Sequence, residues 1–213
     1  MIELLATLAL VVPHRWAGQD VERLPTGEKV VALTFDASWS YDSVPLVLRT
    51  LAHEDVPATF FLTGIFARKY PRATATIARR YELAAHTETH RDLTRLGDAQ
   101  VRGEIVGGDR TVTRYAHVAP ARLLRFPYGA RDARTIRLAN ALGYVCVRWS
   151  IDTWGWMRVS PQTVVQRFVS RLRPGAIVLM HLGAPSDARA LAGVIRAGRA
   201  RGYRFVAVGE YIP

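Results

Sequence analysis

The sequence predicts an α/β protein built around a sheet of about seven parallel strands. From Lys29 onward, short runs of aliphatic and β-branched residues alternate with longer segments of helical periodicity, as in successive βα units. The chain has 213 residues, of which 49% are hydrophobic and 22% are charged. This length and composition are typical of one folded domain. We therefore expect a single globular unit over residues 28–213, preceded by a separate segment, residues 1–27.

Seven runs are predicted as strands because they are short, aliphatic and bounded by turn residues. They are Val30–Phe35, Ala58–Leu62, Leu83–Ala85, Leu123–Phe126, Tyr144–Trp149, Ala176–Met180 and Arg204–Val208.

Five longer segments have apolar residues at helical spacing and plausible first residues. They are Ser43–His53, Asp98–Tyr115, Ala133–Leu142, Pro161–Leu172 and Ala188–Arg201. Gly143 and Gly202 each follow one of these segments, as helix-ending glycines do. Gly107 and Gly108 fall inside the second segment, where we expect them to kink or break the helix.

The N-terminus admits two interpretations. Leu4 to Val12 is apolar and has the length of a signal-peptide core, too short to span a bilayer. No basic residue precedes it, and Glu3 stands where a positive charge is expected. The stretch is therefore either a truncated export signal or a packed N-terminal segment. If it is an export signal, we expect the protein to be located outside the cytoplasm.

Charge and cysteine content narrow the classes of partner. The formal net charge is +11 and the pI is near 10.6, but the arginines are scattered and form no basic stripe interleaved with aromatic residues. We expect no nucleic-acid binding, and a solvated basic surface or attraction to an anionic polymer instead.

Cys146 is the only cysteine, which excludes an intramolecular disulfide and a thiolate metal cluster. We expect no stable membrane insertion and a monomer.

Polar and titratable residues lie at or just after the ends of five of the predicted strands. The carboxyl ends of parallel strands meet on one face of such a sheet, where sites are built. Six residues are therefore expected around one pocket: Asp36, His86, His90, Arg125, Asp152 and His181.

His86 and His90 are four residues apart, which brings two imidazoles together on one turn or tight loop. Two nitrogen ligands suggest zinc or a similar divalent ion, although such pairs also occur on surfaces without a metal. A zincin motif is excluded because Thr87 stands where its glutamate would follow the first histidine.

Asp36 ends the apolar run Val30–Phe35, where an unpaired carboxylate would be costly. Its residue type fits a general base that activates water, and equally a turn or helix-capping aspartate. Arg125 can hold such a carboxylate in its charged form. The turn after Arg125 can present backbone amides to an oxyanion. Asp152 and His181 can form an oriented acid–base pair.

In combination, five stretches resemble the motifs of the NodB-type polysaccharide deacetylases, carbohydrate esterase family four, in the order of that family. They are Thr34-Phe35-Asp36, His86-Thr87-Glu88-Thr89-His90, Arg125-Phe126-Pro127-Tyr128-Gly129, Asp152-Thr153-Trp154-Gly155-Trp156 and Leu179-Met180-His181. The resemblance runs from Lys29 to Pro213. It implies a distorted (β/α) barrel, the NodB-homology fold, and a divalent metal, usually zinc, that polarises an acetyl carbonyl.

The resemblance also implies a role for each matching residue. Asp36 would be the base, His86 and His90 metal ligands, and Arg125 the partner of Asp36. The backbone amide of Tyr128 would hold the oxyanion, and His181 would be the general acid, oriented by Asp152. Trp156 and Leu179 would line the groove that receives the sugar and its acetyl group.

The sequence departs from the family pattern at two positions. Ala37 stands where the family has a second aspartate, the third metal ligand, and a methyl group cannot ligate. Asp42 can substitute for it, or can instead begin the helix near Ser43. Gly155 stands where the fourth motif often has another aspartate.

The resemblance implies removal of acetyl groups from N-acetylated sugars of a cell-wall or chitin-like polymer, with peptidoglycan favoured by the positive charge. An esterase for O-acetyl groups would use the same residues. A carbohydrate-binding protein that has lost efficient catalysis is the alternative that Ala37 favours.

Overall fold

The computed structural model describes residues 12–212, which contain a nine-stranded sheet and seven α-helices. The strands are β1 (Asp20–Val21), β2 (Val30–Ala37), β3 (Thr59–Leu62), β4 (Glu82–Ala85), β5 (Ala121–Leu124), β6 (Val145–Val147), β7 (Ile151–Asp152), β8 (Ala176–His181) and β9 (Arg204–Val206). The helices are α1 (Val44–His53), α2 (Gly64–Lys69), α3 (Pro71–Ala78), α4 (Asp98–Ala116), α5 (Ala133–Ala141), α6 (Pro161–Arg171) and α7 (Pro185–Arg199).

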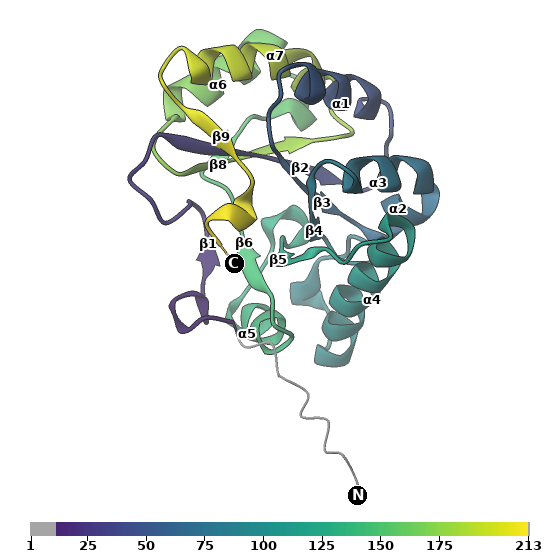
Figure 1. The fold of residues 1–213 in the computed structure, drawn as a ribbon. Coiled ribbons are helices and arrows are strands. Elements are labelled where there is room, and N and C mark those ends of the chain that lie inside the picture. Colours follow the sequence, from purple (N-terminus) through teal and green to yellow (C-terminus); the bar gives the residue numbers. More distant parts are fainter. Residues whose placement is uncertain (1–11, 213) are drawn as a thin grey trace, which may run out of the picture.

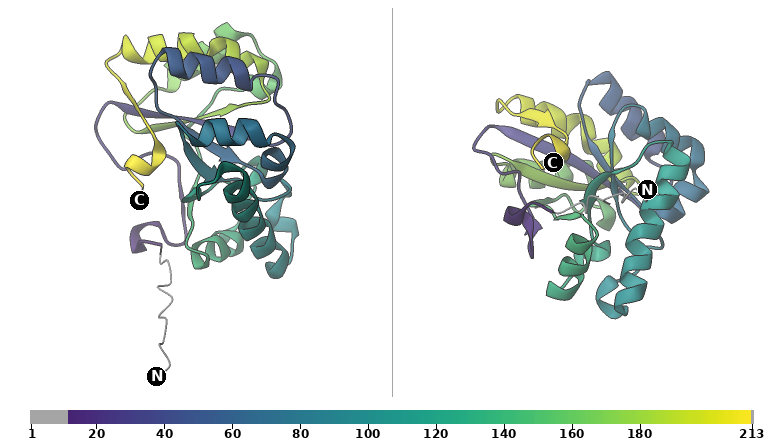
Figure 2. Two further views of the ribbon diagram at one scale, coloured as in Figure 1. Left: turned by 45° about the vertical axis from the view of Figure 1, so that its right-hand side comes forward. Right: turned by 60° about the horizontal axis from the view of Figure 1, so that its bottom comes forward.

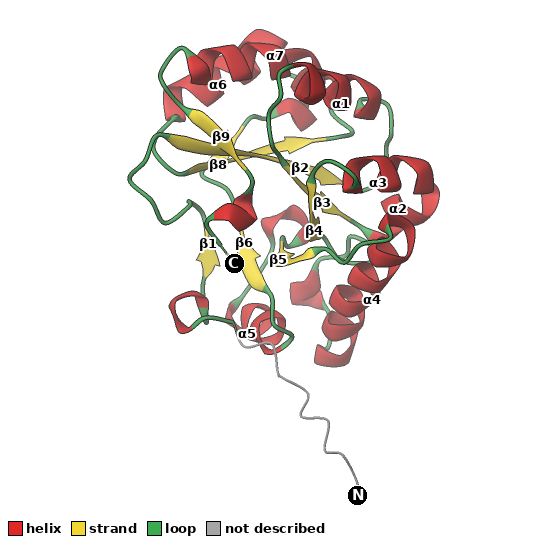
Figure 3. Cartoon of the chain, viewed as in Figure 1, coloured by secondary structure: helices red, strands yellow, loops and turns green. Residues whose placement is uncertain are grey.

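The strands pair in the order β1-β6-β5-β4-β3-β2-β8-β7, and β9 also pairs with β2. All the pairs between these strands are parallel. Helices surround the curved sheet, with α1, α6 and α7 along its upper side, α2, α3 and α4 to the right and α5 below (Figures 1 and 3). This arrangement confirms the expected α/β fold.

Strand β2 shows how the sheet separates two apolar clusters. Val31, Leu33 and Phe35 pack in the cluster shared with the helices, whereas Val30 and Ala32 face the interior of the half-barrel. Alternate residues of a strand point to opposite faces. Every residue of β2 is nevertheless buried, which is why its sequence reads as a continuous apolar run.

The interior cluster is filled from both ends of the described chain. Val12, Trp16 and Leu24 belong to it, and so do Val208 and Ile212 near the C-terminus. The two described ends therefore lie near the same side of the barrel, as two further views show (Figure 2). Of the apolar stretch Leu4–Val12, residues 4–11 lie outside the described residues.

All seven predicted strands are present, and β1 and β7 are two further strands of two residues each. Such short strands carry too little periodicity to be predicted. Helices α2 and α3 are also additional to the five predicted ones. They are separate helices because Tyr70 is the C-cap of α2 and Pro71 is the first residue of α3.

The expectation that Gly107 and Gly108 kink or break a helix was wrong, because α4 runs unbroken through both. Gly108 lets the helix approach the backbone of Thr87, whereas Gly107 faces the side chain of Glu88 at an ordinary contact distance. Gly108 thus marks a close contact between elements and not an end of a helix.

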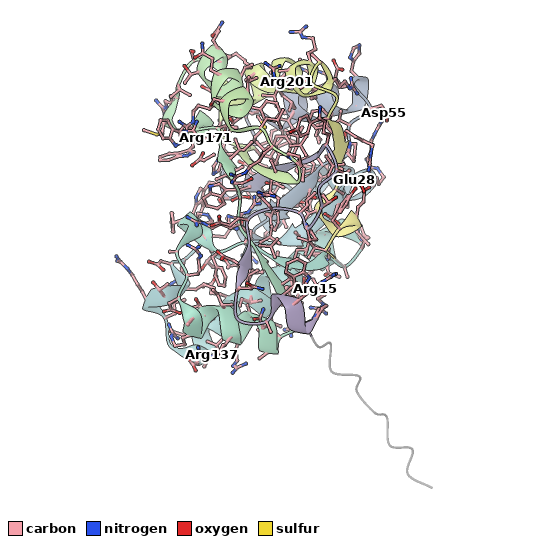
Figure 4. All side chains as sticks on the ribbon, turned by 90° about the vertical axis from the view of Figure 1, so that its left-hand side faces the viewer. Arg15, Glu28, Asp55, Arg137, Arg171 and Arg201 are labelled. Carbon is pink, nitrogen blue, oxygen red and sulfur yellow. The ribbon has the colours of Figure 1, made fainter. Side chains whose placement is uncertain are left out.

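Charged side chains are spread over the surface, with Arg15, Arg137, Arg171 and Arg201 at widely separated places (Figure 4). Within residues 12–212, no helix combines the length and the apolar character needed to cross a membrane.

Candidate active site

The carboxyl ends of β2 and β8 form the floor of a cavity of about 480 Å³. Asp36 and His181 are paired neighbours in the register of these two strands. The cavity lining includes Asp36, Trp39, His90, Tyr128, Trp149, Asp152, Trp156, Leu179 and His181. Four of the six residues predicted around one pocket therefore line the cavity, and the other two, His86 and Arg125, contact Asp36.

Arg125 is the fully buried centre of this site. Its Nη1 donates to Asp36 Oδ1 at 2.7 Å and to Thr34 Oγ1 at 2.8 Å, and its Nη2 donates to the carbonyl of Arg148 at 2.9 Å. The guanidinium lies over the ring of Phe61, 4.0 Å from its centroid. A planar fork of five donors suits this enclosed position, where a lysine would leave acceptors unpaired.

Asp36 is buried but stays ionised because of its neighbours. Burial works to raise the pKa of its carboxyl, but the charge of Arg125 and the imidazoles of His86 and His181 outweigh burial and hold the pKa below its usual range. A carboxylate in this state can accept a proton from water.

His86 is oriented by the backbone of Arg125. Its Nδ1 lies 2.8 Å from the carbonyl oxygen of Arg125, which can only accept, so Nδ1 carries the hydrogen. The Nε2 lone pair then faces Asp36 Oδ2 at 3.5 Å. Burial lowers the pKa of His86 despite the nearby carboxylate. A neutral imidazole fixed by a carbonyl in this way is the usual form of a metal ligand.

His90 lies beside His86 at the end of the histidine loop, residues 86–90. The two ring centroids are 4.8 Å apart. Thr87 and His90 both have left-handed backbone conformations, with φ of 69° and 59°, so the loop is held in an uncommon shape. Glu104 of α4 helps to hold it by accepting the amide of Thr89 at 2.8 Å. Burial lowers the pKa of His90 to about 4.

Two imidazole nitrogens of the site are available as ligands of one divalent ion. His90 Nδ1 is buried and has no hydrogen-bond partner among the described residues, and His86 offers Nε2. In the part of the chain that the structure describes, however, no three His, Cys, Asp or Glu side chains converge as a metal site. A third ligand would have to be water or substrate.

Ala37 contributes no ligand. Its methyl group is 1% exposed and packs in the apolar cluster shared with the helices. The departure from the family motif seen in the sequence is thus a real loss of a polar group at the end of β2.

Asp42 does not replace that ligand. Its carboxylate accepts from Ser40 Oγ at 2.9 Å, and it lines a neighbouring cavity instead of the one above the histidines. The interpretation as a helix cap is wrong as well, since the residue before α1 is Ser43. The short turn from Ser40 to Asp42 satisfies the carboxylate locally.

Tyr128 lies in a 3-10 turn, Pro127–Gly129, with φ of 60°. Its side chain is 70% exposed, and its ring contacts His90 edge-on at 4.7 Å between centroids. The side chain of Tyr128 therefore lies next to a candidate metal ligand.

His181 ends β8, and its side chain is 29% exposed at the cavity. Asp152, predicted to orient it, accepts the backbone amide of Trp154 at 2.9 Å. The carboxylate nearest to the imidazole is a different one: Asp187 Oδ2 lies 4.0 Å from His181 Nδ1.

The cavity rim is aromatic. Trp156 is 55% exposed and Trp39 is 52% exposed, whereas Leu179 is almost fully buried beneath them and lines the floor. Exposed indole faces stack on the apolar faces of sugar rings, and a small buried apolar side chain leaves room for a methyl group.

Sequence reasoning missed Trp39, Trp149 and Asp187. The two tryptophans stand outside the matched motifs, and their exposure was not readable from the pattern. For Asp187 there was an indirect signal, since Gly155 left a place in the fourth motif empty.

Comparisons with known proteins can now be set against this geometry. Residues 23–147 match the family model described as polysaccharide deacetylase. A chitooligosaccharide deacetylase of Sinorhizobium fredii is 34% identical over 78% of this chain and 78% of its own length. A peptidoglycan-N-acetylglucosamine deacetylase of Bacillus cereus is 32% identical over 74% of this chain and 57% of its own.

Solved structures give the same fold. A peptidoglycan N-acetylglucosamine deacetylase superposes with a TM-score of 0.85 at 30% identity, over 90% of this chain and 91% of that one. A CE4 family pseudoenzyme from Bacillus anthracis superposes with a TM-score of 0.87 at 27% identity, over 92% and 70%. The family expected from the five motifs is confirmed: the chain belongs to the polysaccharide deacetylase family.

Proposed function

We propose that this protein removes acetyl groups from N-acetylated sugars of a polysaccharide, with peptidoglycan or a chitin-like polymer as substrate. The observation that carries the proposal is the ionised Asp36, held by Arg125 and facing the lone pair of His86, with His181 on the adjacent strand. The proposed base, the proposed acid and one proposed ligand, His90, line one cavity, and the second proposed ligand, His86, lies beside Asp36.

His86 and His90 would hold a divalent ion, for which zinc is our proposal. When bound, the ion supplies Lewis-acid polarisation of the acetyl carbonyl. Its affinity is expected to be weaker than at a site with three protein ligands, because Ala37 offers none.

The chain's own residues move the protons. Asp36 takes a proton from the attacking water, whose oxygen bonds to the acetyl carbon. The Tyr128 amide would stabilise the oxyanion. His181 then gives a proton to the sugar nitrogen as the carbon–nitrogen bond breaks, leaving acetate and a free amine. An O-acetyl ester would be cleaved by the same residues, with an alcohol as the leaving group.

The substrate class is supported by the cavity and by the relatives. The exposed indoles of Trp39 and Trp156 suit stacking on sugars, and Leu179 suits an acetyl methyl group. The relatives at 34% and 32% identity carry the names of chitooligosaccharide and peptidoglycan deacetylases. A net charge of +11 favours approach to an anionic wall.

A second candidate is a carbohydrate-binding protein with impaired catalysis. Ala37 and the likeness to a pseudoenzyme favour it. A mutant of that pseudoenzyme has restored enzymatic activity.

Acetate release and metal content distinguish the two candidates. Purified protein is assayed on acetylated chitooligosaccharides and on peptidoglycan, with and without a chelator, and its zinc is measured. We expect zinc-dependent release that Asp36→Asn abolishes while zinc stays bound, and that Asp42→Ala leaves unchanged. Acetate release that a chelator does not affect would refute the metal-dependent mechanism. If neither polymer releases acetate, the carbohydrate-binding protein is the candidate that remains.

We also propose that the protein acts outside the cytoplasm as a monomer, because a wall polymer is found there and one chain already holds the whole proposed set of residues. Cell fractionation and light scattering of the purified protein test the two statements separately.

A further inference from the structure

Asp187 is a buried carboxylate that none of the five motifs includes. It lies in the first turn of α7 and is 0% exposed. Its Oδ1 accepts from Thr153 Oγ1 at 2.7 Å, and its Oδ2 accepts from the backbone amide of His181 at 2.9 Å. One oxygen is therefore fixed against the loop after β7 and the other against the backbone of the proposed acid.

The same carboxylate faces the imidazole of His181. Asp187 Oδ2 lies 4.0 Å from His181 Nδ1, and this nitrogen is buried without a hydrogen-bond partner among the described residues. Catalytic hydrogen bonds are often long before substrate binds and tighten in the complex. A movement of about 1 Å would bring this pair to hydrogen-bond distance.

Gly155 points to the same arrangement independently. A Cβ atom on Gly155 would lie 2.0 Å from Asp187 Oδ1 and 2.1 Å from its Cγ. The carboxylate of Asp187 therefore occupies the space into which a side chain at position 155 would project. Position 155 is where the fourth family motif often has an aspartate.

We propose that Asp187 is the positioning residue of His181 and that its carboxylate, from α7, fills the space into which a side chain at position 155 would project. The inference rests on the proposed function, in which His181 is the general acid. A glycine at 155 is then required, because the two carboxylates cannot occupy one space.

The electrostatic surroundings of His181 are consistent with this role. Burial lowers the pKa of His181, the carboxylates of Asp36 and Asp152 raise it, and His86 and Arg125 lower it. Asp187 also faces the ring, and burial raises the pKa of Asp187 to about 7. Asp187 therefore carries a negative charge beside His181 only near and above neutral pH.

The first test does not need catalysis. The imidazole signals of His181 are titrated by NMR in the wild type and in Asp187→Asn, with His181→Gln used for assignment. We expect the pKa of His181 to fall by about 1 in Asp187→Asn, because an opposite charge nearby favours the imidazolium. Asp109→Asn is the matched control, because Asp109 is a half-buried carboxyl on α4 whose pKa burial also raises, and it should leave the pKa of His181 unchanged. An unchanged pKa of His181 in Asp187→Asn would overturn the proposal.

The second test uses the deacetylation assay. Asp187→Ala is expected to lower kcat by about 10- to 100-fold with KM little changed, and Asp187→Asn to move the alkaline limb of the kcat profile to lower pH. The exchange variant with Gly155→Asp and Asp187→Ala should recover a large part of the loss. A folded exchange variant no more active than Asp187→Ala would overturn the exchange. If the wild type releases no acetate, the proposed function fails while the titration still decides the role of Asp187.

Discussion

Replacement of Gly108 in α4 by alanine should displace the histidine loop, whereas replacement of Gly107 should not. An ideal Cβ on Gly108 would lie 2.4 Å from the carbonyl carbon of Thr87, 2.5 Å from its oxygen and 2.8 Å from the amide nitrogen of Glu88. All three are backbone atoms, so no side-chain rotation relieves the contact. On Gly107 the nearest atom would be Glu88 Cβ at 3.6 Å, an ordinary contact.

These distances set the expected magnitudes. Carbon atoms pack best at about 3.5–4.0 Å, so Gly108→Ala requires a shift of about 1 Å between α4 and the loop. Overpacking of this kind costs about 1–3 kcal/mol, and the gain in helix propensity from glycine to alanine offsets about 0.5–1 kcal/mol of it. We expect Gly108→Ala to lower the free energy of unfolding by about 1–2 kcal/mol, and Gly107→Ala to raise it by up to about 1 kcal/mol.

The shift should also reach the candidate metal ligands, because Thr87 directly follows His86 and lies three residues before His90. We expect zinc affinity to fall by about 10-fold or more in Gly108→Ala, the range found when outer contacts of metal ligands are lost. Urea unfolding followed by tryptophan fluorescence gives the stability, and competition with a chromogenic chelator gives the affinity. Equal stability and equal affinity in the two variants would refute this account of the glycines.

Three further predictions concern buried groups. Arg125→Met leaves Asp36 buried without its partner and should lower the free energy of unfolding, measured with urea, by about 3–5 kcal/mol. The control Arg80→Met, at an exposed ion pair, should lower it by less than about 1 kcal/mol. Similar losses in the two variants would contradict the importance of the buried pair. Ala37→Asp places a carboxylate where the methyl group is 1% exposed. With a chelator present, the free energy of unfolding should therefore fall by about 1–3 kcal/mol, whereas the affinity for zinc should rise. Unchanged zinc affinity measured by calorimetry would argue against a metal site at the end of β2. Burial raises the pKa of the Cys146 thiol to about 12, so a disulfide reagent should react with it only after denaturation, and prompt reaction of the native protein would show that the region opens.

The floor of the site was predictable because it follows from strand periodicity. Asp36 and His181 each end an aliphatic run, and parallel strands bring such ends to one face. The pairing of Arg125 with Asp36 was expected as well, since a carboxylate at the end of a buried strand needs a cation. The structure adds that Arg125 is itself fully enclosed and also bonds Thr34 and the carbonyl of Arg148.

What could not be predicted depends on contacts between elements distant in sequence. Gly107 and Gly108 were interpreted through local helix propensity, but the tertiary contact with Thr87 decides their role. Asp187 has the position of an ordinary acidic residue in a first helical turn. Only the packing of α7 against the loop that contains Gly155 shows that its carboxylate is directed to His181.

The burial pattern also shows which residues distinguish an enzyme from a binding protein. Arg125 and Asp36 must be kept together in either case, because removing one partner leaves an uncompensated buried charge that costs about 3–5 kcal/mol. Their pairing is therefore expected in an enzyme and in a binding protein alike, and the proposed catalysis depends on His86 and His181 beside the pair. His181 is different, since its side chain is partly exposed and its Nδ1 has no partner among the described residues, so the fold does not require it. Asp187 buries a carboxylate beside that nitrogen, at a cost in stability that an apolar residue would avoid. Substitution of His181 therefore tests catalysis with little effect on stability, whereas Asp187 also accepts hydrogen bonds from Thr153 and from the backbone of His181.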